Sequence, residues 1–267
     1  MQLPKISIIT PSYNQALYLE QSIQSVLSQE YPNLEYIIID GGSKDGSVDI
    51  ISKYNEYITY WTSEPDKGQS DALNKGFSLA TGDIIGWLNS DDTYQPGTFR
   101  EVANIFKNNA IHVAMSEYFG FMDNLEKIYA FKKNQYKNHK TLIRYWKTNG
   151  MTINQPCVFF RRELISNMHP VMDTTLNYAM DYDLWLRLSL FEPFHVVPGH
   201  WANYRFHDQS KSGKGFGMFV PEWYTVSRRY WGKRYSRDWF SHWLSWSFYT
   251  NIRKLSKYLK TVFLNKQ

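Results

Sequence analysis

The chain has 267 residues, of which 43% are hydrophobic and 21% are charged. This length predicts one or two globular domains with a buried core. The single cysteine, Cys157, excludes an internal disulfide and fits a reducing compartment. No apolar run approaches the roughly 18 residues of a membrane span, and the first residues do not resemble a secretion signal. We therefore expect a cytoplasmic protein, soluble or peripheral on the inner face of the cell membrane.

The net charge of +5 is unevenly distributed. Residues 221–267 contain ten Lys and Arg against two acids, 10 − 2 = +8, and five of the ten tryptophans. A basic, aromatic segment of this kind is typical of contact with an anionic membrane surface. Two other interpretations stay open, a helical lid packed on the domain and a surface that binds single-stranded nucleic acid.

The first ninety residues alternate between strand and helix patterns. The β-rich runs 5–14 and 35–47 each end in turn residues, and apolar spacing predicts a helix over about 17–30 between them. Such alternation indicates a parallel sheet with right-handed crossovers. The next elements are a helix through 48–51, a strand at 58–64, a helix over 69–80 closed by Gly82, and a strand over 84–88.

The second half has a looser pattern. We expect a polar surface loop over 132–140 and place Cys157 in a buried strand. A helical stripe connects Leu184, Leu188 and Phe191. The other expected elements are a helix over 95–109, strands near 112–122 and 127–133, and a strand followed by a helix over 154–165.

Two adjacent carboxylates, Asp91 and Asp92, follow the apolar strand at 84–88. Open α/β sheets bind ligands at the carboxyl ends of their strands. Mg²⁺ and Mn²⁺ prefer oxygen ligands and often join one or two carboxylates to the phosphates of a substrate. The pair therefore indicates a metal site for a phosphate-bearing ligand, with a solvated turn as the simpler alternative.

Candidate nucleoside contacts follow the first two strands. Tyr13 offers an aromatic face for a base, and Asp40 offers a carboxylate that accepts hydrogen bonds from a base or a ribose. Neither run is a P-loop or a dinucleotide-binding fingerprint, which disfavours the commonest nucleotide-binding classes.

Four runs, TPSYNQ, DGGSKDGS, PDKGQSDALNKG and NSDD, resemble family 2 glycosyltransferases with the GT-A fold, in this order and spacing. The similarity covers roughly residues 4–210. It implies an α/β fold with a mixed sheet flanked by helices, and we expect a helical C-terminal extension after this fold. The expected domains are 1–215, with a nucleotide-binding half 1–110 and an acceptor and catalytic half 111–215, and the extension 216–267.

The resemblance also implies the donor and metal residues. The family's metal motif is usually Asp-x-Asp, and Asn89 stands at its first position here. This leaves Asp91 and Asp92, with His207 from the run YRFHDQSKS, as expected ligands of Mn²⁺ or Mg²⁺. The implied donor-binding residues are Pro11, Ser12, Tyr13, Asn14, Asp40, Lys67, Asp71, Asn89, Ser90 and Asp91.

The family's acidic catalytic motif resembles the run AMDYDLWLRL, in which Met180 replaces the usual Glu. Asp181 is then the expected catalytic base and Asp183 the fallback. A carboxylate in the first turn of a helix, opposite the leaving phosphate, can deprotonate an attacking hydroxyl. The alternative is that both acids only interact with the helix dipole.

Other side chains are assigned by analogy. Arg205, Lys211 and Lys214 are candidates to neutralise a diphosphate, with a solvated mobile loop as the alternative. Gln155 lies where relatives place the acceptor and sugar pocket, and it is a weak acceptor-binding candidate.

The predicted activity is metal-dependent, inverting transfer of a sugar from a nucleotide diphosphate donor, expected to be UDP-linked, to a saccharide acceptor. A lipid-linked acceptor, as in bacterial O-antigen or other surface-polysaccharide assembly, would suit a membrane-bound tail. The alternatives are a catalytically impaired nucleotide-sugar-binding protein, suggested by Asn89 and Met180, and a binding module for membrane or nucleic acid. A nucleotidyltransferase is disfavoured because its Gly-rich basic first loop is missing.

Overall fold

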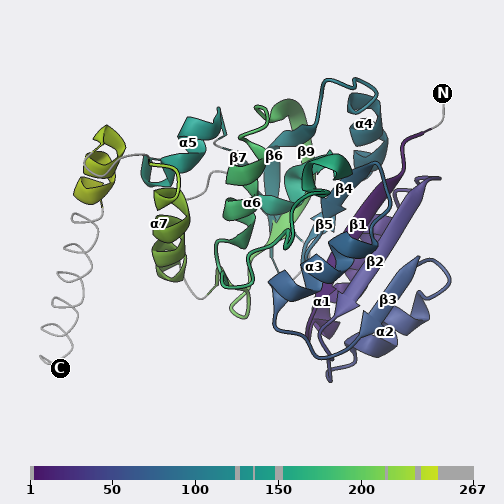
Figure 1. The fold of residues 1–267 in the computed structure, drawn as a ribbon. Coiled ribbons are helices and arrows are strands. Elements are labelled where there is room, and N and C mark those ends of the chain that lie inside the picture. Colours follow the sequence, from purple (N-terminus) through teal and green to yellow (C-terminus); the bar gives the residue numbers. More distant parts are fainter. Residues whose placement is uncertain are drawn as a thin grey trace, which may run out of the picture.

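A computed structural model describes residues 3–123, 127–134, 136–147, 153–213, 216–231 and 236–245. Its nine strands and its helices form one α/β arrangement (Figure 1). The strands are β1 Ile6–Ser12, β2 Leu34–Asp40, β3 Tyr60–Ser63, β4 Ile84–Trp87, β5 Thr93–Tyr94, β6 Val113–Met122, β7 Ile128–Lys133, β8 Val158–Arg161 and β9 His195–Arg205. The α-helices are α1 Ala16–Leu27, α2 Ser47–Lys53, α3 Gln69–Leu79, α4 Thr98–Ile105, α5 His139–Ile143, α6 Met180–Leu188 and α7 Val220–Arg228. Short 3₁₀ turns are η1 Tyr145–Lys147, η2 Gln155–Cys157, η3 Arg162–Ile165 and η4 Phe216–Met218.

The strands form a mixed sheet in the order β3-β2-β1-β4-β8-β6-β9-β5, with β7 paired to β6. The first four strands in this order are parallel, as the alternating pattern predicts. The strand β8 is antiparallel to both β4 and β6. The expected α/β fold with a mixed sheet flanked by helices is therefore confirmed, and the parallel half presents the carboxyl ends of four strands along one edge.

The parallel strands are buried on both faces, which explains their continuous apolar runs. Ile9 and Ile85 pack with α3 on one face, whereas Ile8 and Ile84 pack with α1 and α4 on the other. These side chains have exposed fractions of 0%. Because neighbouring residues of a strand point to opposite faces, each strand contributes to both cores.

The start of the C-terminal segment is part of the protein core. Trp223, Val226 and Trp231 are buried with residues of the sheet and of α6. In Figure 1, α6 lies between the sheet and α7. For these residues the packed-lid interpretation is confirmed, and the two tryptophans do not offer the exposed faces that stacking on nucleic acid requires. Residues 246–267 lie outside the described part of the chain.

Several local expectations are wrong. The stretch 132–140 is not simply a surface loop, because Tyr136 is buried and stacks on Phe194 and because α5 begins at the end of this stretch. Phe191 is 64% exposed and follows the last turn of α6. Cys157 is buried as expected but ends η2, directly before β8.

The expected closing role of Gly82 is also wrong. The helix α3 ends at Leu79, and the next residue, Ala80, already has extended backbone. Gly82 instead packs against β1, where a side chain would collide with Ser7. Its small size, rather than a left-handed conformation, explains the glycine.

In the part of the chain that the structure describes, no helix combines the length and the apolar character that crossing a membrane requires.

The substitution Gly86→Ala tests the close packing of the sheet beside the site. A methyl group at this position would lie 2.6 Å from Phe159 Cε1 and 2.8 Å from Ile8 Cδ1. We expect a loss of about 1–3 kcal/mol in the free energy of unfolding, because neither neighbour can move without disturbing the core. Urea unfolding measures this loss, and Gly86→Ala with wild-type stability would show that the sheet is less tightly packed.

Candidate active site

The predicted donor-binding residues gather at the carboxyl edge of the parallel strands. Three of the four strands, β1, β2 and β3, end at Ser12, Asp40 and Ser63, and these residues are paired side by side in the sheet. The strand β4 lies next to β1 and ends at Trp87. Pro11, Ser12 and Asp40 lie at the ends of β1 and β2, and Asp71 lies in the first turn of α3. The other predicted donor-binding residues, Tyr13, Asn14, Lys67, Asn89, Ser90 and Asp91, lie in the loops after the strands, so the fold places the whole set at one end of the sheet.

Asp40 is fully buried and fixes its own loop. One carboxylate oxygen accepts hydrogen bonds from the backbone N–H groups of Gly42 and Ser43, at 3.1 and 2.8 Å, and from Ser63 Oγ at 2.7 Å. The other oxygen accepts one from Ser43 Oγ at 2.5 Å. A contact with a nucleoside, as predicted from the sequence, would therefore compete with bonds that hold β2, its loop and β3 together.

Tyr13 and Asp66 flank the backbone of Gly41. A side chain at Gly41 would lie 2.9 Å from Asp66 Oδ2 and 3.2 Å from the Tyr13 ring. The Tyr13 side chain is 62% exposed, and Asp66 Oδ1 accepts a hydrogen bond from the Gly68 N–H at 2.7 Å. An exposed ring beside a carboxylate is suited to a base, so Asp66 joins the candidate donor site. Sequence reasoning missed it, although it stands in the PDKG run.

The other predicted donor-binding side chains make local contacts in the loops and at the start of α3. Asn14 has a left-handed backbone, and its side chain accepts a hydrogen bond from the Lys44 N–H at 3.0 Å. Asp71 accepts one from the Lys67 N–H at 3.2 Å and lies 3.5 Å from Lys75 Nζ. Lys67 itself is exposed at this edge. These contacts shape the loop entrances and leave the Lys67 ammonium on the surface.

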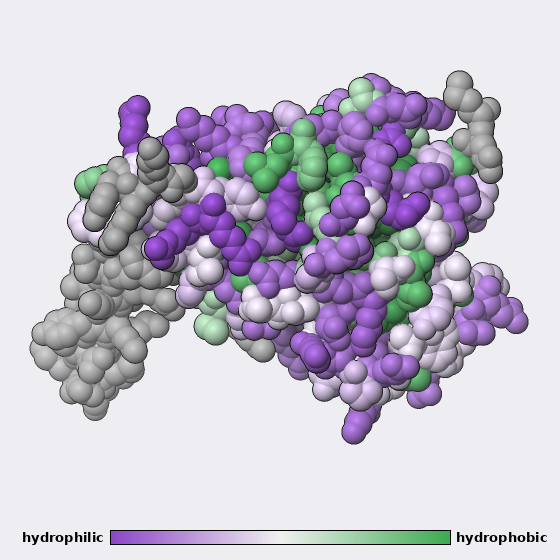
Figure 2. Space-filling view, viewed as in Figure 1, coloured by the Kyte–Doolittle hydropathy of each residue, from purple (hydrophilic) through white to green (hydrophobic). Residues whose placement is uncertain are grey.

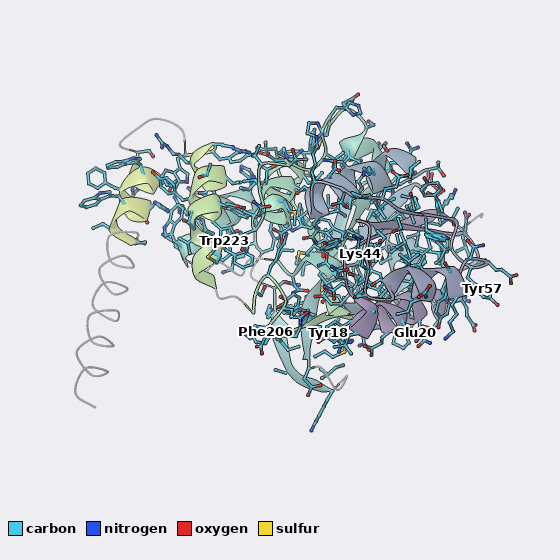
Figure 3. All side chains as sticks on the ribbon, turned by 90° about the horizontal axis from the view of Figure 1, so that it is seen from below. Tyr18, Glu20, Lys44, Tyr57, Phe206 and Trp223 are labelled. Atoms are coloured by element: carbon cyan, nitrogen blue, oxygen red, sulfur yellow. The ribbon has the colours of Figure 1, made fainter. Side chains whose placement is uncertain are left out.

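Asp91 and His207 form the clearest polar pair at the site. Asp91 Oδ2 lies 3.0 Å from His207 Nε2, and the Asp91 side chain is 18% exposed. His207 follows β9 and packs against Tyr18 of α1, with 4.6 Å between ring centroids. Tyr18 and Phe206 accordingly lie near each other in Figure 3. The structure thus brings together residues that are 116 positions apart, as the resemblance implied.

This pair fits part of a metal site. Two neighbouring ligands of an octahedral ion with bonds of about 2.1 Å are separated by roughly 3 Å, as these two atoms are. The described residues contain no group of three or more His, Cys, Asp or Glu side chains arranged to hold a metal. Asp91 and His207 would therefore need further ligands from a bound diphosphate or from water.

Asp92 has a structural position. Its carboxylate is fully buried and accepts hydrogen bonds from the Arg205 backbone N–H at 2.9 Å and from Asn89 Nδ2 at 3.2 Å. Burial and, secondarily, the charge of Asp91 raise the pKa of Asp92 well above its usual value. The geometry does not favour Asp92 as a metal ligand, because its oxygens bind β9 and the turn. Ser90, in the same turn, is also buried.

Arg205 supports the same turn and is not available for a diphosphate. Its guanidinium donates to the Asp91 carbonyl at 2.8 Å, to the Asp123 carbonyl at 2.7 Å and to the Gln21 side chain. It also stacks on the Tyr18 ring, 4.7 Å from the ring centroid. The side chain is 1% exposed, which corrects its assignment as a phosphate-neutralising residue.

Lys211 connects the two halves of the site. Its ammonium donates to Gln69 Oε1 of α3 at 2.8 Å and to the Asn177 carbonyl at 2.5 Å, just before α6. Gln69 Nε2 in turn donates to Asn89 Oδ1 at 2.7 Å. A continuous set of hydrogen bonds therefore runs from the approach to α6 to the Asp91 turn. Lys214, the other predicted cation, lies outside the described residues.

Asp181 lies in the first turn of α6 with a perturbed pKa. Desolvation raises the pKa of this carboxyl to about 6, and the Tyr182 N–H, 2.7 Å from Oδ1, and the Lys211 charge oppose the rise. A carboxylate of this pKa is still ionised at neutral pH and is a stronger base than an ordinary Asp. Its electrostatics therefore suit the role of base that the sequence predicts.

Asp183, the fallback base, is a structural residue by its contacts. It is 2% exposed and pairs with Arg187 Nε at 2.9 Å and with Arg229 Nη1 at 2.7 Å. Each carboxylate oxygen is thus paired with a guanidinium group. The ion pair with Arg229 joins α6 to the end of α7. Met180, at the position of the missing acid, is buried against Ser70 Oγ.

Gln155 is buried with one end of its amide satisfied. Its Nε2 donates to the Trp87 carbonyl at the end of β4, at 2.5 Å. Its Oε1 is buried and has no hydrogen-bond partner among the residues that the structure describes. Because a buried acceptor without a partner is costly, a hydroxyl donor at this position would be stabilising.

The fold and the site together define an α/β protein whose candidate site residues gather at the carboxyl ends of its parallel strands. Comparison with known proteins gives the family. The model of glycosyl transferase family 2 matches residues 7–168, which is more than half of the chain. The chain belongs to glycosyl transferase family 2, and the GT-A fold expected from the sequence is confirmed.

Curated relatives match parts of the chain. An uncharacterized glycosyltransferase of Rickettsia typhi is 31% identical over 192 residues, covering 69% of this chain and 58% of that protein. An uncharacterized glycosyltransferase of Mycobacterium tuberculosis is 41% identical over 92 residues, covering 34% of this chain and 35% of that protein. The chain thus spans little more than half the length of the first relative.

Two solved structures share the fold. The crystal structure of S. aureus TarS 1–349 in complex with UDP-GlcNAc has a TM-score of 0.66 at 16% identity, covering 83% of this chain and 64% of that one. The mannosyltransferase PcManGT of Pyrobaculum calidifontis, in complex with GDP-Man and Mn²⁺, has a TM-score of 0.64 at 16% identity, covering 86% and 65%.

The substitution Asp183→Asn tests whether Asp183, the fallback base, has a structural role. It removes the charge that holds Arg187 and Arg229, so we expect a loss of about 2 kcal/mol in unfolding free energy, reduced from a fully buried pair because both arginines are partly exposed. Thermal and urea unfolding measure this loss. Binding of nucleotide by the folded variant should stay within twofold of wild type. An unchanged stability would remove the structural assignment.

Proposed function

We propose that the chain is an inverting glycosyltransferase that transfers a sugar from a nucleotide diphosphate donor to a hydroxyl of a saccharide acceptor. The observation that carries this proposal is the set of hydrogen bonds from the Asn177 carbonyl through Lys211 and Gln69 to Asn89. It joins the approach to α6, whose first turn contains the basic carboxylate Asp181, to the turn that contains Asp91. Family membership and the shared fold support the same reaction class.

The chain's own residues supply the acid–base chemistry. Asp181 accepts the proton of the acceptor hydroxyl while that oxygen attacks the anomeric carbon. The bond from this carbon to the phosphate oxygen breaks, and its electrons leave with the nucleoside diphosphate. Attack from the face opposite the leaving group inverts the carbon. The proton ends on Asp181. The positive charge of Lys211 lies close enough to lower the pKa of this carboxyl.

A divalent cation, Mn²⁺ or Mg²⁺, fits the donor set of Asp91 and His207. When bound, it would stabilise the negative charge of the departing diphosphate as a Lewis acid. The Mn²⁺ complex of the mannosyltransferase supports this assignment at the level of the fold. Asp92 is left out of the proposed ligand set because its oxygens hold Arg205 and Asn89.

We infer a uridine nucleotide as the donor carrier. Support comes from the exposed Tyr13 ring beside the Asp66 carboxylate, which suits a base with an N–H donor, and from the fold shared with TarS, which was crystallised with UDP-GlcNAc and with UDP. The unsatisfied Gln155 Oε1 beside Trp87 offers an acceptor for a sugar hydroxyl. Which sugar is transferred depends on such contacts.

The acceptor is proposed to be lipid-linked, as in surface-polysaccharide assembly, with peripheral membrane contact near the C-terminal segment. The residues Phe240, Trp243 and Leu244 are 50%, 50% and 59% exposed and have the spacing of one helix face. Figure 2 shows a visible face that is largely hydrophilic, with a few apolar patches. An exposed apolar face on a basic segment suits a membrane interface.

Asp181→Asn tests the proposed base. The amide cannot accept the proton, so we expect sugar transfer to fall by on the order of a hundredfold or more while UDP affinity changes less than twofold. In wild type, kcat should fall as the pH drops below about 6, because the carboxylate that must be ionised becomes protonated. Transfer rates and calorimetry check this. Asp181→Asn with a wild-type rate would eliminate the mechanism.

The paired substitution Phe240→Ser and Trp243→Ser tests the membrane contact. Flotation with anionic vesicles should show binding reduced on the order of tenfold, because the apolar face no longer inserts. The matched control is Leu190→Ser with Phe191→Ser, which removes two side chains of similar exposure elsewhere, 60% and 64%. Equal flotation of both paired variants would argue against a membrane role for this face.

A further inference from the structure

The helix α6 is held at its start by a carboxylate from another helix. Its own preceding residue, Ala179, has no capping side chain. The Glu222 carboxylate of α7 instead accepts hydrogen bonds from the backbone N–H groups of Asn177, at 3.1 and 3.0 Å to its two oxygens, Tyr178, at 2.7 Å, and Ala179, at 2.9 Å. Free N–H groups at a helix start attract a negative charge, and this carboxylate supplies it.

A second contact holds α7 to α6 one turn further along. Arg229, which follows α7, pairs with Asp183, and Val226 and Trp223 bury the face between the two polar contacts. Asp181 lies between the residues that Glu222 and Arg229 hold. The direction of its side chain therefore depends on two contacts made by the C-terminal segment.

We propose that Glu222 is a positioning residue of the reaction, which orients Asp181 by holding the three residues that lead into α6. The part of this inference that concerns turnover rests on the proposed function. Glu222 itself does not contact the reacting atoms. The same three residues include Asn177, whose carbonyl accepts the hydrogen bond of Lys211, so Glu222 also supports the connection to the donor half.

The position of Glu222 has an electrostatic consequence. Among the charged groups around Asp181, Lys211 lowers its pKa and Glu222 raises it. On α6 itself, Asp183 is neutralised by Arg187 and Arg229, and on α3, Asp71 lies beside Lys75. Removing the Glu222 charge should therefore lower the pKa of Asp181. A residue with a purely structural role elsewhere would not shift this titration.

The test compares Glu222→Gln, Glu222→Asp and the control Glu101→Gln in the full chain. Glu101 is exposed in the first turn of α4, away from the site. Carbon-13 NMR follows the carboxyl titration of Asp181 without substrate, with its signal assigned through Asp181→Asn. We expect the midpoint of about 6 to move to lower pH in Glu222→Gln and to stay in place in Glu222→Asp and Glu101→Gln.

Turnover provides the second measurement. In Glu222→Gln, kcat should fall by about tenfold with donor KM changed less than twofold, because orientation is lost while the donor site is intact. Glu222→Asp should recover part of the rate. An Asp181 midpoint and a kcat in Glu222→Gln equal to those of Glu101→Gln would overturn the proposal, as would an equal loss of donor binding.

The two hypotheses fail separately. A wild-type protein without sugar transfer would remove the proposed function, whereas the Asp181 titration would still decide the role of Glu222. If Glu222→Gln does not fold, Glu222→Asp takes its place, and its kcat is measured together with amide hydrogen exchange at residues 177–179. Faster exchange at these amides with kcat equal to that of Glu101→Gln would overturn the proposal, and faster exchange with a lowered kcat would support it.

Discussion

The arrangement of the site depends on one buried contact, in which the Asp92 carboxylate accepts the backbone N–H of Arg205. This bond joins the turn after β4 to the end of β9, although the two residues are 113 positions apart. The Arg205 guanidinium strengthens the joint by donating to the Asp91 carbonyl. Because this contact fixes both strand ends, it places Asp91 and His207 next to each other. The acid next to the proposed metal ligand is thus the residue that positions it.

The same network explains why Asn89 suits its position. Its Oδ1 accepts hydrogen bonds from Trp87 Nε1, at 2.9 Å, and from Gln69 Nε2, while its Nδ2 donates to Asp92. An ionised aspartate at 89 could accept the first two bonds but would repel the Asp92 carboxylate. The amide therefore allows the buried acid Asp92 and the partly exposed acid Asp91 to stand side by side. The loss of one family acid is compatible with a functional site.

The sequence was sufficient for the parallel half of the fold. Apolar runs such as that of β1 alternate with segments of helical spacing. This pattern is typical of a parallel sheet that is covered by helices on both faces. The family resemblance also predicted that Asp91 and His207 lie close together, which the local periodicity of the sequence cannot show. The roles within the site were harder. Asp40, Asp92 and Arg205 have the residue types of ligand contacts, but all three are buried and take part in internal hydrogen bonds that the sequence does not reveal.

The contributions of the C-terminal segment could not be predicted for a different reason. Glu222 and Arg229 act on α6 through contacts more than 40 residues away in sequence, and their composition indicated only a basic, aromatic surface. Tyr136 was missed in the same way, because its Lys- and Asn-rich surroundings hide a ring that packs on Phe194. Long-range packing, rather than local propensity, determines all three.

A donor and metal site at Asp91 is tested by a calorimetric titration with UDP, with and without Mn²⁺, of wild type, Asp91→Asn and the exposed control Asp49→Asn. We expect Mn²⁺ to strengthen UDP binding at least tenfold in wild type and in Asp49→Asn, and we expect Asp91→Asn to lose this dependence while remaining folded. UDP binding in Asp91→Asn with the same Mn²⁺ dependence as wild type would contradict the assignment of the donor and metal site to the carboxyl edge of β4.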